Sequence, residues 1–175
     1  MTSNTKLKKY PVISMTIGII IIIIFSLYQT NAIKSLPCNK GIIDNFKGTF
    51  IHIDQIHLLF NIYGLYTLSR VEIKLGKRKF LILILFLLLS NSILETFMYH
   101  LLPTIPCSIG ISDLLFGILS YEIVSKQGIN VNVLIAIFLS VLLPSLQLEN
   151  VSFSGHIIGA INGIISGIIY SKISK

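Results

Sequence analysis

The sequence predicts an all-α, polytopic membrane protein, built as a bundle of six transmembrane helices with both termini in the cytoplasm. Of the 175 residues, 53% are hydrophobic and 12% are charged, about half the charged fraction of a typical soluble domain. The mean hydropathy is +0.83. Apolar runs of membrane-spanning length recur along the whole chain, and Lys and Arg gather between alternate runs. No soluble domain is expected, since the longest polar stretch is about residues 29–50.

Each spanning helix needs roughly 20 apolar residues, and six segments qualify: about 11–29, 53–70, 79–99, 111–126, 131–148 and 155–172. The first segment could be taken for a signal peptide. Its apolar run, from Val12 to Tyr28, is longer than a usual signal and has no clear A-x-A cleavage site. We therefore expect residues 1–10 to form a cytoplasmic tail and residues 11–175 to form a single membrane domain.

Charge sets the predicted orientation. With the N-terminus inside, only Lys34, Lys40 and Lys47 lie outside. The other Lys and Arg residues lie inside: Lys6, Lys8, Lys9, Arg70, Lys74, Lys77, Arg78, Lys79, Lys126, Lys172 and Lys175. This positive-inside bias explains the net charge of +7 better than nucleic-acid binding does.

Polar residues from three predicted spans reach one depth, just below the outer surface. His57 lies in the outer third of the second span, and Ser112 and His156 open the fourth and sixth spans from outside. Ionisable groups within a membrane are costly and indicate a functional site. A serine, a histidine base and hydrogen-bond donors together are typical of a serine hydrolase.

Ser112 is the candidate nucleophile, and Gly110 allows the backbone to approach closely before it. At a helix start, free backbone N–H groups and the helix dipole favour developing negative charge. The alternative for Ser112 is a simple N-cap, the commonest role for serine before an apolar helix.

His156 is the candidate general base. It stands in a helix whose glycines recur every four residues and so share one face: Gly155, Gly159, Gly163 and Gly167. Such faces let membrane helices approach closely, which would bring His156 to Ser112. The alternative is a packing ridge with an incidental histidine.

His57 and Asn61 are four residues apart and share a helix face. Both can donate hydrogen bonds to an oxyanion, although Asn61 could equally form an interhelical hydrogen bond. His52 is expected at the entrance of the second span, as a structural hydrogen bonder.

Other chemistries lack their motifs. The chain has no His-Glu-x-x-His zinc motif, no paired intramembrane aspartates and no phosphate-binding glycine loop. We expect a Ser–His dyad without metal or cofactor. A transporter using the histidines is a further alternative, but it would need polar residues through the whole membrane depth, and few others occur, notably Asn91 and Glu95.

The ordered set of motifs resembles the rhomboid family of intramembrane serine proteases over about residues 48–172. The matching segments are His52-x4-His57-x3-Asn61, Glu72-x-x-Leu75-Gly76, Gly110-Ile-Ser112-Asp-Leu-Leu-Phe116-Gly117 and His156-x-x-Gly159-x3-Gly163.

The resemblance implies a rhomboid-like bundle around a water-filled cavity, with Ser112 as nucleophile and His156 as base. It implies oxyanion donors at Asn61, His57 and backbone N–H groups near Ser112, and packing of Phe116 on His156. The substrates would be single-span membrane proteins in the lipid bilayer, cut near the outer boundary. Nucleic acid and metal are not expected as partners.

Two departures from the family pattern stand out. Asp113 follows the serine where the family usually has glycine, and the first outer loop lacks the family's Trp-Arg pair. We expect Asp113 to suit the helix dipole without facing His156. The alternative is an impaired protein that binds or escorts membrane clients. Cys38 and Cys107 are both expected outside, where they could pair in an oxidising compartment.

Overall fold

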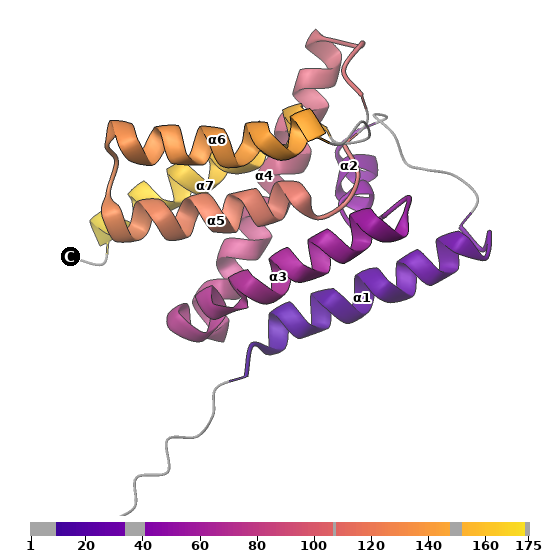
Figure 1. The fold of residues 1–175 in the computed structure, drawn as a ribbon, viewed down its shortest axis with the longest axis horizontal. Helices are drawn as coiled ribbons and strands as arrows, with labels where there is room; N and C mark the ends of the chain where they lie inside the picture. Colours follow the sequence, from indigo (N-terminus) through magenta and orange to yellow (C-terminus); the bar gives the residue numbers. More distant parts are fainter. Residues whose placement is uncertain (1–9, 34–40, 107, 148–151, 174–175) are drawn as a thin grey trace, which may run out of the picture.

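The computed structural model describes residues 10–33, 41–106, 108–147 and 152–173. These residues form seven helices, and no strand occurs among them. The helices are α1 (Val12–Gln29), α2 (Ile42–Gly48), α3 (Gln55–Leu75), α4 (Lys77–Leu101), α5 (Ser112–Gln127), α6 (Val131–Gln147) and α7 (Phe153–Ile173), shown in Figure 1. The predicted all-α class is confirmed. Cys38 and Cys107 lie outside the described residues, so their pairing stays a prediction.

Each of the six predicted spans falls on a helix. By length and composition, α1, α4 and α7 can cross a membrane, and α6 contains a shorter apolar stretch, Val131–Leu143. Helices α5 and α6 have 16 and 17 residues, somewhat fewer than the roughly 20 that a perpendicular crossing needs. The six-span count and the cytoplasmic position of the termini therefore stay predictions.

The short helix α2 was not expected, because the sequence predicts only a loop over residues 29–50. Its buried face contains Asn45 and Gly48 rather than large apolar residues, so no hydrophobic periodicity marks it. Asn45 donates a hydrogen bond from Nδ2 to Thr96 Oγ1 of α4 at 2.8 Å. This contact holds α2 against the C-terminal half of α4.

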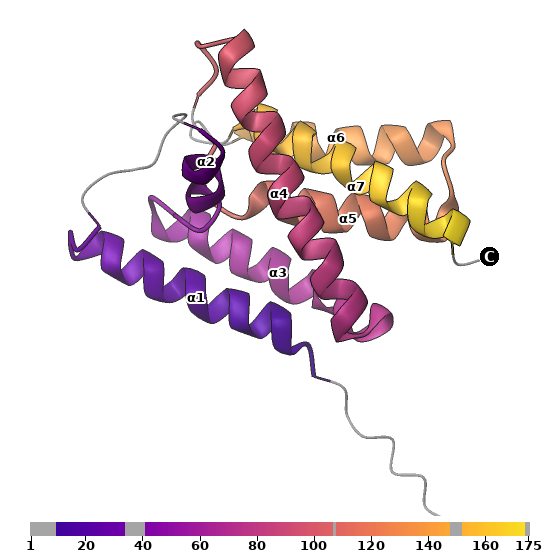
Figure 2. The ribbon, with the colours of Figure 1, turned by 180° about the vertical axis from the view of Figure 1, so that it is seen from behind.

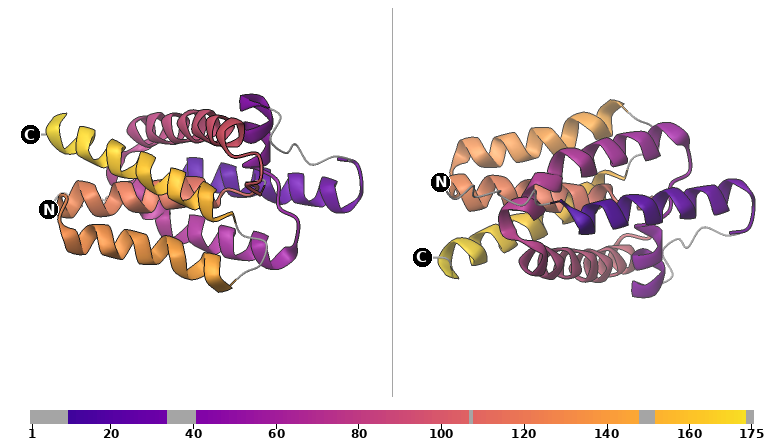
Figure 3. Two further views of the ribbon diagram at one scale, coloured as in Figure 1. Left: turned by 90° about the horizontal axis from the view of Figure 1, so that it is seen from above. Right: turned by 90° about the horizontal axis from the view of Figure 1, so that it is seen from below.

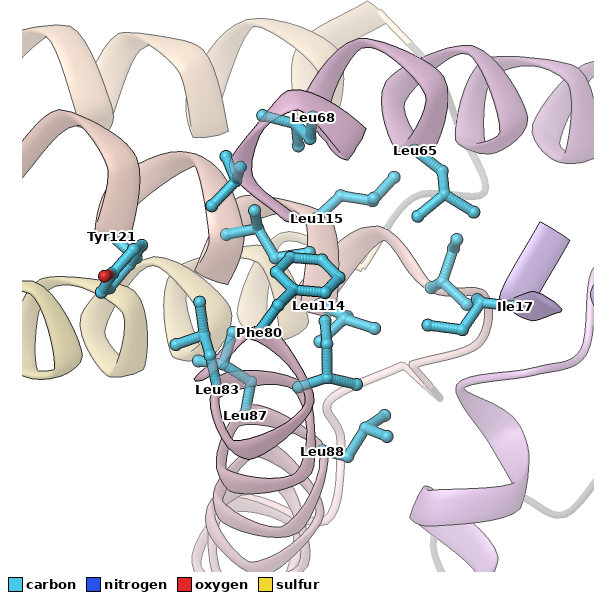
Figure 4. Packing of buried hydrophobic residues seen from close by; sticks show 14 of the residues in the cluster. Ile17, Leu65, Leu68, Phe80, Leu83, Leu87, Leu88, Leu114, Leu115 and Tyr121 are labelled. Atoms are coloured by element: carbon cyan, nitrogen blue, oxygen red, sulfur yellow. The ribbon is translucent and has the colours of Figure 1, made fainter. Parts of the chain in front are cut away.

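Helix α4 crosses the other long helices steeply (Figures 2 and 3). On one side of this crossing α1 and α3 run side by side, and on the other α5, α6 and α7 pack together. Phe80 and Leu87 of α4 are fully buried where the groups meet, together with Leu114 of α5 (Figure 4). The outward faces carry large apolar side chains, as expected for helices in lipid.

A buried carboxylate joins α1 to α3. Glu72 Oε1 accepts the backbone N–H of Ile13 at 2.9 Å, and Oε2 accepts the N–H and hydroxyl of Ser14, each at 2.8 Å. The first N–H groups of a helix have no partner within the helix, and Pro11 at the N-cap position of α1 supplies no side-chain acceptor. Glu72 fills that need from another helix.

The ends of α3 and α5 are joined by charges on the same side of the bundle. The buried Glu122 of α5 binds Lys74 at 2.9 Å, Arg70 at 3.5 Å and Lys126. These bases belong to the group predicted inside, and Arg70 and Lys74 each lie two residues from Glu72, which holds the start of α1. The structure therefore brings together helix ends that are predicted to lie on the same, cytoplasmic side of the membrane.

Candidate active site

The loop before α5 is held from two sides. Gly110 donates its N–H to the Gly48 carbonyl at the end of α2, at 3.0 Å. The Tyr99 hydroxyl of α4 donates to the Pro106 carbonyl at 2.6 Å and accepts the N–H of Ser108 at 2.9 Å. These bonds fix the backbone just before Ser112, which begins α5 and is half-buried.

Gly110 meets a specific requirement for glycine. Its φ is +92°, and a β-carbon built on it would lie 2.7 Å from His57 Nε2 and 3.2 Å from Asn61 Nδ2. A side chain would be strained by the backbone conformation and would have no room. The loop therefore passes directly against the two α3 side chains that the sequence nominates as oxyanion donors.

The start of α3 places His57 and Asn61. The Asp54 side chain caps the helix by accepting the His57 N–H at 2.7 Å, and Asn61 follows one turn later. Asn61 is 5% exposed, and its Nδ2 has no hydrogen-bond partner among the described residues. An unsatisfied buried donor is costly, and this one lies beside the loop that leads to Ser112.

His52 lies between α2 and α3, wholly buried, with its ring centroid 5.0 Å from that of His57. Burial, and to a smaller extent the charge of His57, lowers the pKa of His52 to about 4. Its imidazole is therefore neutral at pH 7. His52 packs against His57. It precedes α3, which begins at Gln55, and so it is not part of the helix face that carries Asn61.

Helices α5 and α7 run in parallel with almost no space between them. A β-carbon on Gly159 would clash with the Asp113 carbonyl, and one on Gly163 with the Gly117 carbonyl. At Gly167 it would lie 2.9 Å from the Val124 side chain. The structure thus confirms the close packing predicted from the glycine repeat. Because the contacts advance in step along both helices, Asp113 in the first turn of α5 lies level with Gly159, nearly two turns into α7.

His156 lies in the first turns of α7 and is 3% exposed. Its ring packs on Phe116 of α5, with centroids 4.4 Å apart, and the imidazole hydrogen-bonds to the backbone of Val141 on α6. A hydrogen bond from one ring nitrogen to a carbonyl fixes the tautomer and leaves the other nitrogen as an acceptor. His156 is thus held between two helices, at the level of the Gly110–Ser112 turn.

Asp113 is placed differently from the simple expectation. It lies in the first turn of α5, and Oδ1 accepts the Leu114 N–H at 2.7 Å, which agrees with a helix-start role. However, Asp113 is only 2% exposed, and its Oδ2 also accepts a hydrogen bond from Asn91 Nδ2 of α4 at 2.9 Å. Asn91 Oδ1 in turn accepts Asn162 Nδ2 of α7 at 2.6 Å.

The sequence marks Asn91 as a polar residue in an apolar helix but indicates no role for Asn162. The only signal for this network was the presence of amide side chains within membrane helices. Glu95, one turn from Asn91, is also buried. No group of three or more His, Cys, Asp or Glu side chains that could hold a metal ion occurs in the described part of the chain.

Comparison with known proteins agrees with this arrangement. A family model described as "Rhomboid domain" matches residues 41–173, a segment that includes α2 to α7 and every candidate site residue. A protein of Acanthamoeba polyphaga mimivirus, named a "putative rhomboid protein", is 28% identical to the chain over 153 residues. That match covers 87% of this chain and 86% of the viral protein.

Proposed function

The chain is an integral membrane protein that belongs to the rhomboid family, and on this premise we propose that it is an intramembrane serine endopeptidase. Ser112 is the nucleophile and His156 the general base. The substrates are single-span membrane proteins, cut near the outer boundary of the bilayer. Residues 11–175 act as one membrane domain with both ends in the cytoplasm, and no metal or cofactor takes part.

The parallel contact of α5 with α7 carries this proposal. Gly159 lies directly against the backbone of Asp113, the residue after Ser112, and His156 precedes Gly159 by three residues, less than one turn. Phe116, one turn after Ser112, packs on the His156 ring. The base and the nucleophile therefore come from adjacent turns of two helices whose relative height is fixed.

The chemistry follows from these positions. His156 takes the hydroxyl proton of Ser112, whose oxygen attacks the substrate carbonyl to form a tetrahedral intermediate. His156 then returns the proton to the leaving amine, and the acyl-enzyme forms. Water activated by the same imidazole attacks the ester and releases Ser112.

Asn61, His57 and the backbone N–H groups at the start of α5 stabilise the oxyanion. The Nδ2 of Asn61 has no hydrogen-bond partner within the described ranges, and this supports the role, because a donor that is satisfied only when the oxyanion forms contributes to the transition state rather than to the resting fold. Gly110 gives the substrate carbonyl access by keeping side-chain atoms away from His57 and Asn61.

The decisive experiment is labelling with a fluorophosphonate, which reacts with activated serines, in proteoliposomes. Wild type should be labelled at Ser112 and should cleave a single-span model substrate, and Ser112→Ala should do neither. His156→Ala should also abolish labelling. Ser120→Ala is the matched control, because Ser120 is a buried serine further along the same helix, and it should leave both activities intact.

The alternative role of a client-binding protein without protease activity is tested in the same experiment. Absence of labelling in folded wild type, together with retained binding of a single-span client, would reject the protease proposal. The side chain of Asp113, which motivated this alternative, is engaged with α4 rather than with α7.

A further inference from the structure

Two amide side chains and one carboxylate form a buried chain of hydrogen bonds that ends at the residue after Ser112. Asn162 of α7 donates to Asn91 of α4 at 2.6 Å, and Asn91 donates to Asp113 of α5 at 2.9 Å. Each of the three residues is buried. The chain therefore joins three helices at one depth within the bundle.

Backbone packing closes this chain into a ring. The backbone of Asp113 touches Gly159 of α7, and Asn162 follows Gly159 by three residues, so it lies nearly one turn further along. Asp113 is thus held on one side by the α7 backbone and on the other by Asn91. Sliding α5 along α7 would break the hydrogen bonds or separate the Gly159 contact.

The ring lies next to both proposed catalytic groups. Ser112 is covalently adjacent to Asp113, and His156 stands three residues before Gly159. A shift of about 1 Å between a nucleophile and its base can lower the rate about 100-fold. In a low-dielectric interior, unpaired polar groups are strongly disfavoured, so the ring permits few alternative heights of α5 against α7.

We propose that Asp113 is a positioning residue, which sets the height of Ser112 relative to His156 through the hydrogen-bonded ring with Asn91 and Asn162. This inference rests on the proposed protease function. Asp113 takes no proton from the reaction and does not touch the substrate. Its carboxylate accepts two hydrogen bonds, from Leu114 and Asn91, which glycine or alanine at this position could not do.

A swap of donor and acceptor tests the ring. Asn91→Asp places a second carboxylate against Asp113 and removes the donor between them. Adding Asp113→Asn restores every hydrogen bond of the ring. In the bond between α4 and α5, the donor then lies on α5 and the acceptor on α4. The new amide on α5 donates to the new carboxylate on α4 and still accepts the Leu114 N–H, and the α4 carboxylate still accepts from Asn162.

The measurements are the rate of fluorophosphonate labelling of Ser112, kcat and KM for a single-span substrate, and thermal unfolding.

We expect Asn91→Asp to slow labelling and lower kcat by roughly 10- to 100-fold, with KM unchanged, and the double variant to recover most of both rates. Ser14→Ala is the control for general destabilisation, because it removes a buried interhelical hydrogen bond far from Ser112. It should lower the unfolding temperature and leave the labelling rate unchanged.

The outcomes separate this inference from the proposed function. If wild type is labelled but Asn91→Asp reacts equally fast, the positioning role is rejected and the protease proposal stands. If Asn91→Asp does not fold, the folded double variant decides, since slow labelling there also rejects the role. If folded wild type is not labelled at all, both proposals fail.

Discussion

The ring of Phe116 lies 4.4 Å from the ring of His156, measured between centroids, with the planes inclined at 46°. The contact joins α5 to α7 within one turn of Ser112. Because the His156 imidazole also bonds to the Val141 backbone of α6, its orientation depends on both neighbouring helices. Removing either contact should leave the His156 imidazole in place but less well oriented toward Ser112.

Phe116→Ala should lower kcat without abolishing cleavage. An aromatic pair contributes about 0.5–1.5 kcal/mol beyond its buried area, so loss of orientation corresponds to a decrease of up to about tenfold. Phe116→Tyr keeps the ring and should retain nearly full activity. Steady-state cleavage of a single-span substrate measures both, and equal kcat for wild type and Phe116→Ala would contradict the orienting role.

Gly159→Ala should destabilise the protein by about 1–3 kcal/mol or more, as overpacking does, because the added methyl group meets the Asp113 backbone. Gly18→Ala is the matched control: its methyl group would have neighbours at 3.7 and 3.8 Å, an ordinary contact. In an α-helix alanine is favoured over glycine by about 1 kcal/mol. Thermal unfolding in detergent should therefore separate the two variants in opposite directions.

Asn61→Ala should lower kcat by about 10²- to 10³-fold, the usual cost of removing one oxyanion donor. Its effect on stability should be small, because the Nδ2 group has no partner in the described residues. Asn45→Ala should behave in the opposite way, losing the bond to Thr96 and about 1 kcal/mol of stability while activity persists. A large loss of stability with unchanged kcat in Asn61→Ala would reassign Asn61 to a packing role.

Gly110→Ala should abolish activity even in protein that remains folded. The substitution strains a backbone with φ +92° and drives the methyl group into His57 and Asn61. Gly128→Ala shares the positive φ, at +70°, but has open space around it. It should cost about 1–3 kcal/mol from the backbone alone and leave cleavage unaffected. Full activity of Gly110→Ala would show that the loop relaxes and that the close approach is not required.

The apolar segments were predictable because burial in lipid demands a long apolar run, which is local in sequence. Helices α1, α4 and α7 follow from this demand alone. The α5–α7 contact was also predictable, since a glycine every four residues marks one face of one helix. In contrast, α2 has only 7 residues and buries an asparagine, so no local sequence pattern predicts this helix.

The polar network around Asp113 was not predictable because its members come from distant parts of the chain. Asn91 precedes Asp113 by 22 residues, and Asn162 lies 71 residues beyond Asn91. Their meeting depends on where α4 crosses α5 and α7, which hydropathy and periodicity do not determine. The place of Asp113 directly after Ser112 predicts a role at the start of a helix, and the structure adds its hydrogen bond with Asn91 of α4.

The carboxylate of Glu72 also sets the extent of the autonomous folding unit. Helix α1 precedes residues 41–173, which the family model matches. Without α1, Glu72 would lose the donors from Ile13 and Ser14, and its carboxylate would be left without these partners. Trimming the protein to the matched segment would therefore remove a structural partner and not a dispensable extension, and the shortest chain able to fold alone should begin no later than Val12.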